Sequence, residues 1–156
     1  WRDRFGLTEA GAQLLTIAPG SSAGETHKRW PAAHYGRLVR LALERNAAWR
    51  CALFGGVEET ALLEGVKSAA GAEVARRIHL VTERELDSAL AVLSESVCVV
   101  TNCNGPAHMA ALVGAPLVSL YGPTNAGNTA AFTPDLRVVS RGFACSPCYR
   151  HEFLRG

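Results

Sequence analysis

The sequence predicts an α/β fold in which helices cover both faces of a doubly wound parallel sheet. Short apolar runs rich in Val, Leu and Ile alternate with amphipathic stretches along the whole chain, the pattern of such sheets. The 156 residues, 48% of them hydrophobic, suffice for one domain of about 100–200 residues but not for two. Because no repeat or linker interrupts the pattern, residues 1–156 are expected to form a single domain.

Six segments are predicted as strands because each is short, largely apolar and bounded by Gly, Pro, Asn or a polar turn. They are Leu14–Ala18, Arg50–Phe54, Arg77–Val81, Val97–Thr101, Leu117–Tyr121 and Arg137–Ser140. Strands that are buried on both faces of a parallel sheet read as continuous apolar runs, without strict alternation.

Four helices are predicted between these strands, at Pro31–Arg45, Glu58–Ala70, Glu83–Ser94 and Gly105–Val113. The first three repeat apolar residues with a period near 3.6. The fourth begins beside Pro106 and stops at Gly114, which are typical start and stop signals. The order of strands and helices is that of a Rossmann-like sheet.

Composition excludes several classes of function. The net charge is only +2 and the basic residues are scattered, so we expect no nucleic-acid partner. No apolar run approaches the roughly 20 residues that span a bilayer, and the N-terminus lacks the features of a signal peptide. Cys51, Cys98 and Cys103 lie in or beside apolar runs, as reduced thiols do. The expected location is the cytoplasm.

The loops that follow the strands are the places to search for a ligand, because ligands of such sheets bind beyond the carboxyl ends of the strands. The dinucleotide fingerprint Gly-x-Gly-x-x-Gly does not follow the first strand, so NAD is not supported. That loop instead holds small residues that let backbone N–H groups approach an anion. Ser21, Ser22 and Lys28 are therefore candidates for binding phosphate. The alternative is an ordinary solvated polar loop.

Two further loops carry polar residues at the predicted edge. Glu58, after the second strand, is a candidate for binding ribose hydroxyls, although acidic residues in a first helical turn often only complement the helix dipole. After the fourth strand, Asn104 and Gly105 open a helix whose free N–H groups suit phosphate, and His108 follows one turn later. A lone His on an apolar helix is otherwise a core residue. Thr124 is expected on the same rim.

Together these segments resemble a known family. Five motifs occur in order: Pro19-Gly-Ser-x(6)-Lys28-Arg-Trp-Pro31; Gly55-Gly-x-Glu58; Asn102-x-x-Gly-Pro-x-His108-x-Ala110-Ala-x-x-Gly-x-Pro116; Tyr121-Gly-Pro-Thr124; and Cys145-x-Pro-Cys148. They are similar to those of the ADP-heptose:lipopolysaccharide heptosyltransferases, glycosyltransferase family nine. The match spans nearly the whole chain.

The resemblance implies a two-domain GT-B enzyme of which this chain is the C-terminal, donor-binding half. It implies inverting transfer of heptose, or a related sugar, from an ADP-sugar to a lipopolysaccharide core acceptor, without metal or cofactor. Lys28, Gly105 and His108 would line the diphosphate site, and Glu58 would hold the ribose. The catalytic base is unknown here and is expected in the absent N-terminal acceptor domain. This chain alone is therefore expected to be inactive, and the whole enzyme to contact the inner membrane peripherally.

One departure from the family pattern keeps alternatives open. Where the family reads Asn-Asp-Ser/Thr-Gly-Pro, this chain has Cys103 and Asn104, so a carboxylate has become a thiol and a hydroxyl an amide. A variant member that uses another nucleotide sugar, or a non-catalytic nucleotide-sugar-binding module, is consistent with that change. A GT-B-like epimerase half would lack the Lys-x-Trp-Pro signature.

The Cys145-x-x-Cys148 pair, with His151 and Glu152 nearby, has the spacing of half a zinc site. A full site needs four ligands, and the family's further cysteine is replaced by Phe153 or lost. We expect two free thiols and no bound metal.

Overall fold

The computed structural model describes residues 2–82 and 85–148 and contains one six-stranded sheet. Every strand pair is parallel, and the strand order is β3-β2-β1-β4-β5-β6. The strands are β1 (Gln13–Ala18), β2 (Trp49–Phe54), β3 (Ile78–Val81), β4 (Ser96–Asn102), β5 (Leu117–Tyr121) and β6 (Leu136–Ser140). The chain builds outward from β1 in one direction and from β4 in the other, so the predicted doubly wound sheet is confirmed.

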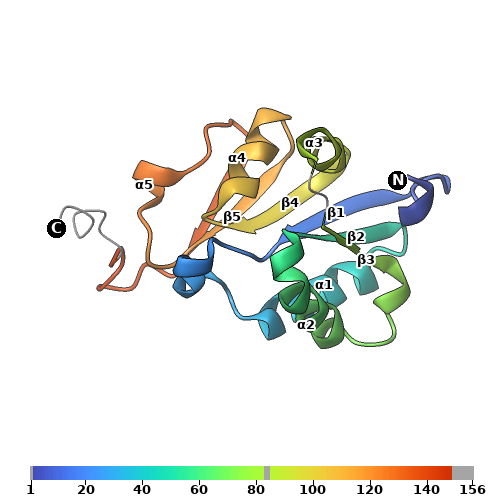
Figure 1. Cartoon of the computed structure of the whole chain (residues 1–156), viewed down its shortest axis with the longest axis horizontal. Coiled ribbons are helices and arrows are strands. Elements are labelled where there is room, and N and C mark those ends of the chain that lie inside the picture. Colours follow the sequence, from blue (N-terminus) through green and yellow to red (C-terminus); the bar gives the residue numbers. More distant parts are fainter. Residues whose placement is uncertain (1, 83–84, 149–156) are drawn as a thin grey trace.

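Helices cover both faces of this sheet (Figure 1). They are α1 (Ala32–Arg45), α2 (Thr60–Ala70), α3 (Leu86–Ser94), α4 (Gly105–Leu112) and the short α5 (Ala126–Thr129). The 3-10 turns are η1 (Asp3–Phe5), η2 (Ala23–Lys28), η3 (Val57–Glu59) and η4 (Ala75–Arg77). The pair α1 and α2 covers one face, and α3 and α4 cover the other.

The six predicted strands are confirmed, with ends that differ by at most one residue. Three of the helices need a correction at one end. Pro31 is the N-cap of α1 instead of its first residue, α2 is preceded by a separate 3-10 turn that contains Glu58, and α4 ends at Leu112 instead of Val113. The predicted start at Glu83 lies outside the described residues, and the described part of that helix begins at Leu86.

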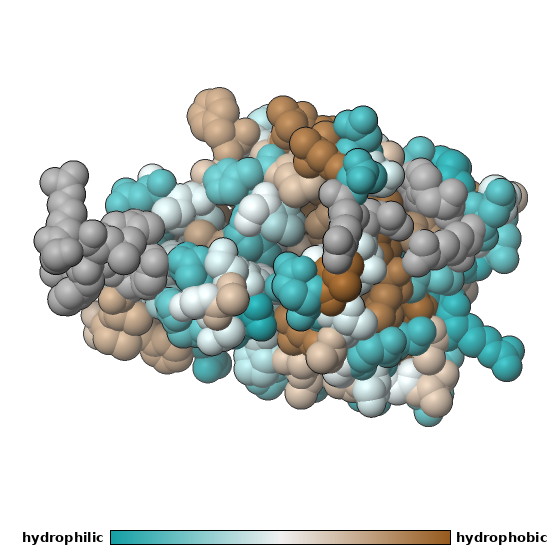
Figure 2. Space-filling model, in the orientation of Figure 1, coloured by the Kyte–Doolittle hydropathy of each residue, from teal (hydrophilic) through white to brown (hydrophobic). Residues whose placement is uncertain are grey.

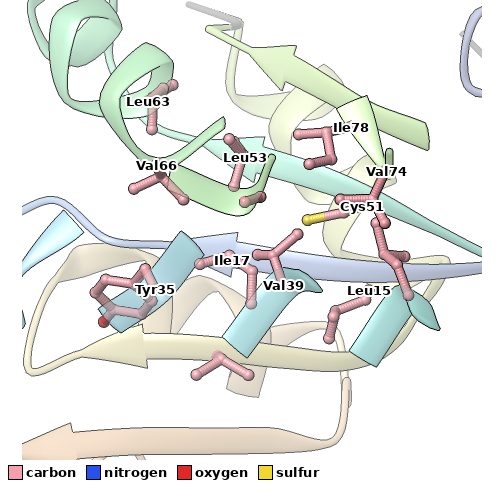
Figure 3. Close-up of a cluster of buried hydrophobic side chains, with 13 residues drawn as sticks. Leu15, Ile17, Tyr35, Val39, Cys51, Leu53, Leu63, Val66, Val74 and Ile78 are labelled. Carbon is pink, nitrogen blue, oxygen red and sulfur yellow. The ribbon is translucent and has the colours of Figure 1, made fainter. Parts of the chain in front are cut away.

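The largest core cluster lies between the sheet and the α1–α2 pair (Figure 3). Its members are buried aliphatic side chains from β1, β2 and β3 together with Tyr35, Val39, Leu63 and Val66 of the two helices. The helices approach closely at Gly36, where an added Cβ would lie 2.5 Å from the Cβ of Ala69. This close contact fixes α1, and with it the segment that leads from β1 into α1.

Two smaller clusters fill the opposite face. One packs Ala89 and Val92 of α3 beneath Phe5 and Phe54, and the other packs α4 against β4 and β5. On the face drawn in Figure 2, hydrophobic residues gather at the upper edge, in the region of α3 and the end of α4. The edge strand β6 is mostly exposed. Along residues 2–82 and 85–148, no helix is long and apolar enough to cross a bilayer.

Candidate functional site

A pocket of about 420 Å³ opens at the carboxyl ends of β1, β2 and β4. The strand order changes direction between β1 and β4, which is where doubly wound sheets bind ligands. One wall consists of the loop after β1 and the start of α4. The other wall consists of the turn after β2 and the first part of α3. The pocket therefore joins three of the loops that the sequence selected.

Five predicted site residues line this single pocket. They are Ser21, Ser22, Glu58, Asn104 and Gly105. Their convergence from segments more than 80 residues apart is the main geometric result. Each assignment of a residue to phosphate or ribose stays a prediction.

Three other predicted residues lie outside the pocket lining. Lys28 is mostly buried, with 8% of its side chain exposed, and its Nζ lies 2.5 Å from a carboxylate oxygen of Glu25. His108 is exposed on α4. Thr124 is buried, and its hydroxyl has no hydrogen-bond partner among the described residues. Contact of these side chains with a donor would require a movement or a larger ligand.

The peptide between Gly20 and Ser21 is held from both sides at the base of the pocket. Its carbonyl accepts hydrogen bonds from Nδ2 of Asn104 at 2.9 Å and from Nδ2 of Asn102 at 3.2 Å. Its N–H donates to Oε1 of Glu59 at 3.0 Å. Three segments thus fix one peptide, so the loop after β1 is an ordered part of the pocket and not a loosely solvated connector.

Asn102 is a buried junction that the sequence reasoning missed. Its Oδ1 accepts from the N–H of Trp30 at 3.2 Å and from the hydroxyl of Tyr35 at 2.8 Å. Its Nδ2 also donates to the carbonyl of Pro19 at 2.6 Å. A polar residue that directly ends an apolar strand was the available signal, because a buried amide must find partners.

Glu59, not singled out from the sequence, closes the opposite side of the loop. In addition to Ser21, its carboxylate accepts from the N–H of Gly56 at 3.1 Å and lies 3.4 Å from the guanidinium of Arg29. A Cβ at Gly20 would overlap Oε1 of Glu59, so a side chain there would displace this carboxylate from its present position. Glu58 points elsewhere: it is exposed, and its carboxylate has no ion pair or hydrogen bond with the described residues. The neighbouring glutamates therefore differ in role.

Asn104 and Gly105 place the start of α4 at the pocket. The Oδ1 of Asn104 caps the helix by accepting from the N–H of Ala107 at 3.3 Å. A Cβ added at Gly105 would meet open space, so this residue leaves room for a ligand. The first N–H groups of a helix attract anions, because they lack intrahelical partners and lie at the positive end of the dipole.

Behind this helix start, Cys103 belongs to a cluster of side chains that carry a thiol or a hydroxyl. Its Sγ lies 3.3 Å from the hydroxyl oxygen of Thr129, and the hydroxyl of Tyr121 donates to the carbonyl of Thr129. Burial raises the pKa of the Tyr121 hydroxyl, and the Cys103 thiol raises this pKa further. The Cys103 side chain thus occupies a hydrogen-bonded position behind the start of α4.

No group of three or more His, Cys, Asp or Glu side chains in the described ranges could hold a metal ion. Cys145 and Cys148 are exposed free thiols. His151 and Glu152, the other candidate ligands, lie outside the described residues. The expectation that no metal binds there stays a prediction.

The chain belongs to glycosyltransferase family 9 (heptosyltransferase), whose model matches residues 2–154. It is 33% identical over 113 residues to lipooligosaccharide heptosyltransferase 2 of Haemophilus influenzae, an alignment covering 72% of this chain and 32% of that protein. It is 30% identical over 127 residues to lipopolysaccharide heptosyltransferase 2 of Escherichia coli, covering 81% of this chain and 36% of that protein. The chain spans about a third of the length of these curated relatives.

A solved structure supports the same family. The structure of E. coli ADP-heptose lipopolysaccharide heptosyltransferase II superimposes with a TM-score of 0.77 at 25% identity, covering 89% of this chain and 43% of that chain. The likeness confirms the Rossmann-like sheet, which aligns with less than half of that heptosyltransferase chain.

Proposed function

We propose that this chain is the donor-binding part of an inverting glycosyltransferase that transfers heptose, or a related sugar, from an ADP-sugar to a lipopolysaccharide core acceptor. The observation that carries the proposal is the convergence of five predicted donor-site residues on one pocket at the switch point of the sheet. Membership of glycosyltransferase family 9 supports the same reading.

In this proposal the two walls of the pocket bind different parts of the donor. Leu86, Ala89 and Met109 supply an apolar surface for the base, and Glu58 accepts hydrogen bonds from the ribose hydroxyls. The diphosphate lies toward Ser22 and the start of α4, near Gly105. Among the residues that the structure describes, the charged side chains lining the pocket are both glutamates. In this proposal the positive end of the α4 dipole stabilises the diphosphate, and Lys28 and His108, which lie outside the pocket lining, contact it after their side chains move.

The proposed reaction is a single displacement. The oxygen of an acceptor hydroxyl bonds to the anomeric carbon of the sugar as the bond from that carbon to the phosphate oxygen breaks. ADP leaves with the electron pair, and a general base takes the hydroxyl proton. None of Asp3, Asp87 and Asp135 lines the pocket, so we place this base in the acceptor-binding part of the longer protein. The proposal needs no metal or cofactor.

The acceptor, and the site of action, follow from the same proposal. Lipopolysaccharide core would bind through the acceptor part, and the enzyme would work in the cytoplasm with peripheral contact to the inner membrane. This chain by itself would bind the donor without turnover.

Reconstitution tests the proposal. The chain is joined to the N-terminal half of a family 9 heptosyltransferase and supplied with ADP-heptose and a heptose-accepting lipopolysaccharide core, and ADP release is measured. We expect release that depends on the acceptor and falls when Glu58→Ala is introduced. A folded fusion that binds ADP-heptose but releases no ADP would instead favour a non-catalytic binding module, for which the changed residues Cys103 and Asn104 are the motivating feature.

A further inference from the structure

We infer that Asn104 is a positioning residue, which presets the donor pocket by tying the end of β1 to the start of α4. The inference rests on the proposed function, because it concerns the same pocket. It differs from the sequence-based prediction that Asn104 contacts phosphate directly. In the structure this side chain acts through the backbone of the neighbouring loop.

Both ends of the Asn104 amide are already engaged. The Oδ1 caps α4 at the N–H of Ala107, while Nδ2 donates to the carbonyl of Ala18 at 3.2 Å and to that of Gly20 at 2.9 Å. One side chain thus caps a helix and cross-links it to the neighbouring strand. An amide has two N–H hydrogens for two carbonyls. A phosphate would have to compete for hydrogens that the backbone already uses.

A hydroxyl residue at position 104 would not reproduce this arrangement. A serine or threonine at this position could still cap the helix. A hydroxyl carries a single hydrogen, so it cannot donate to the carbonyls of Ala18 and Gly20 in full at the same time. An amide and a hydroxyl are therefore not equivalent at position 104.

The bond to Gly20 matters because the same peptide is also held at its other end. Its N–H donates to Glu59, which is anchored in turn by Gly56 and Arg29. With carbonyl and N–H both engaged, this peptide has one orientation before any ligand arrives. When a loop is ordered before the ligand binds, binding does not have to supply the entropy lost in ordering it. The hydrogen bonds from Asn104 therefore increase donor affinity although Asn104 does not contact the donor.

The test compares Asn104→Ser with the wild-type chain, using Asn125→Ser as the matched control. Asn125 caps α5 through the same atom, at 2.9 Å from the N–H of Gly127, but does not line the pocket. Two quantities are measured: the hydrogen-exchange rate of the Ser21 amide in the nucleotide-free chain, and the Kd for ADP by calorimetry. The serine retains a capping oxygen, and thermal unfolding verifies that each variant folds.

We expect Asn104→Ser to accelerate exchange of the Ser21 amide at least about tenfold and to weaken ADP binding about five- to tenfold. Asn125→Ser should change neither. Unchanged exchange in Asn104→Ser would overturn the inference, whether or not ADP binding weakens, and weaker binding alone would identify Asn104 as a direct phosphate ligand. Both of those results leave the proposed function standing if the wild type binds ADP. A folded wild type that binds no ADP would overturn the proposed function and this inference with it.

Discussion

The hydroxyl of Tyr35 donates a 2.8 Å hydrogen bond to Oδ1 of Asn102, and both side chains are buried. Tyr35 belongs to the core cluster beneath α1, whereas Asn102 ends β4 at the pocket. Because Nδ2 of Asn102 holds the carbonyls of Pro19 and Gly20, this bond connects the packing of α1 to the loop after β1. The core thus supports the pocket through a single amide.

Removing only the Tyr35 hydroxyl tests that connection. Tyr35→Phe keeps the buried ring but leaves Oδ1 of Asn102 with one donor, the N–H of Trp30. We expect the free energy of unfolding to fall by about 1–2 kcal/mol in urea titrations, the usual result for a buried hydrogen bond. An unchanged unfolding midpoint would show that the hydroxyl bond contributes nothing to stability.

Alkaline pH should destabilise the chain in two stages. Burial raises the pKa of the Cys51 thiol and of the Tyr35 hydroxyl above their ordinary values. The unfolded chain therefore loses these protons at lower pH than the folded chain does. Below the ordinary thiol pKa of about 8.5, both groups are protonated in the folded and the unfolded chain, and the free energy of unfolding is at its full value. Above that pH the free energy of unfolding falls, by up to about 1.4 kcal/mol per pH unit for each group that titrates.

Urea titrations from pH 7 to pH 10.5 measure this decline. Burial also raises the pKa of the Cys98 thiol. Cys51→Val should therefore reduce, but not abolish, the loss of stability between about pH 8.5 and 10, and Tyr35→Phe should reduce the further loss above about pH 10. If Cys51→Val follows the wild-type slope, the thiol is not the group that titrates on unfolding.

Two helical glycines should respond oppositely to alanine. At Gly36 a Cβ would lie 2.5 Å from Ala69 Cβ and 2.7 Å from its backbone carbon, so Gly36→Ala forces the helices apart. We expect a loss of about 1–3 kcal/mol, despite the helix preference of alanine. At Gly65 the first contact is Ala32 Cβ at 3.9 Å, so Gly65→Ala should stabilise by up to about 1 kcal/mol. Thermal unfolding of both variants measures the two changes in stability. If both substitutions changed stability in the same direction, the close approach of α1 and α2 would be contradicted.

Substitutions of Glu58 and Glu59 should have different effects, one on ADP binding and the other on stability. Glu59→Gln replaces a carboxylate that accepts two backbone N–H bonds and faces Arg29, so it should lower the melting temperature. Glu58→Gln changes an exposed group without such partners and should leave melting unchanged while weakening ADP binding. Calorimetry and thermal melting on the same samples give both numbers. A destabilised Glu58→Gln with unaltered ADP affinity would remove Glu58 from the donor site.

Much of the fold follows from local patterns in the chain. The run Leu117–Tyr121 coincides with β5 because it is apolar and lies between a proline and a glycine. The turn η2 and the helix α5 were not predicted, since each is short and lacks an apolar repeat. Tertiary contacts determine such segments more than intrinsic propensity does.

The sequence predicted which residues belong to the site and that they lie at the carboxyl ends of the strands. It did not predict the contacts among them. Glu58 and Glu59 look equivalent in sequence, and only the geometry of η3 turns one toward the loop and exposes the other. Likewise, the sequence placed Asn104 at the start of a helix as a candidate for binding phosphate, and the structure shows that its Oδ1 caps that helix. Its bonds to Ala18 and Gly20 depend on where two carbonyls lie after folding, which no spacing in the sequence encodes.

Isothermal titration of the wild-type chain with ADP, UDP and GDP, repeated on Lys28→Ala and His108→Ala, tests the central claim most directly. The account predicts that the chain binds ADP in preference to the other two nucleotides, and that both substitutions weaken this binding. A folded chain that binds none of the nucleotides, or binds all three equally well, would contradict the assignment of the pocket to an ADP-sugar donor.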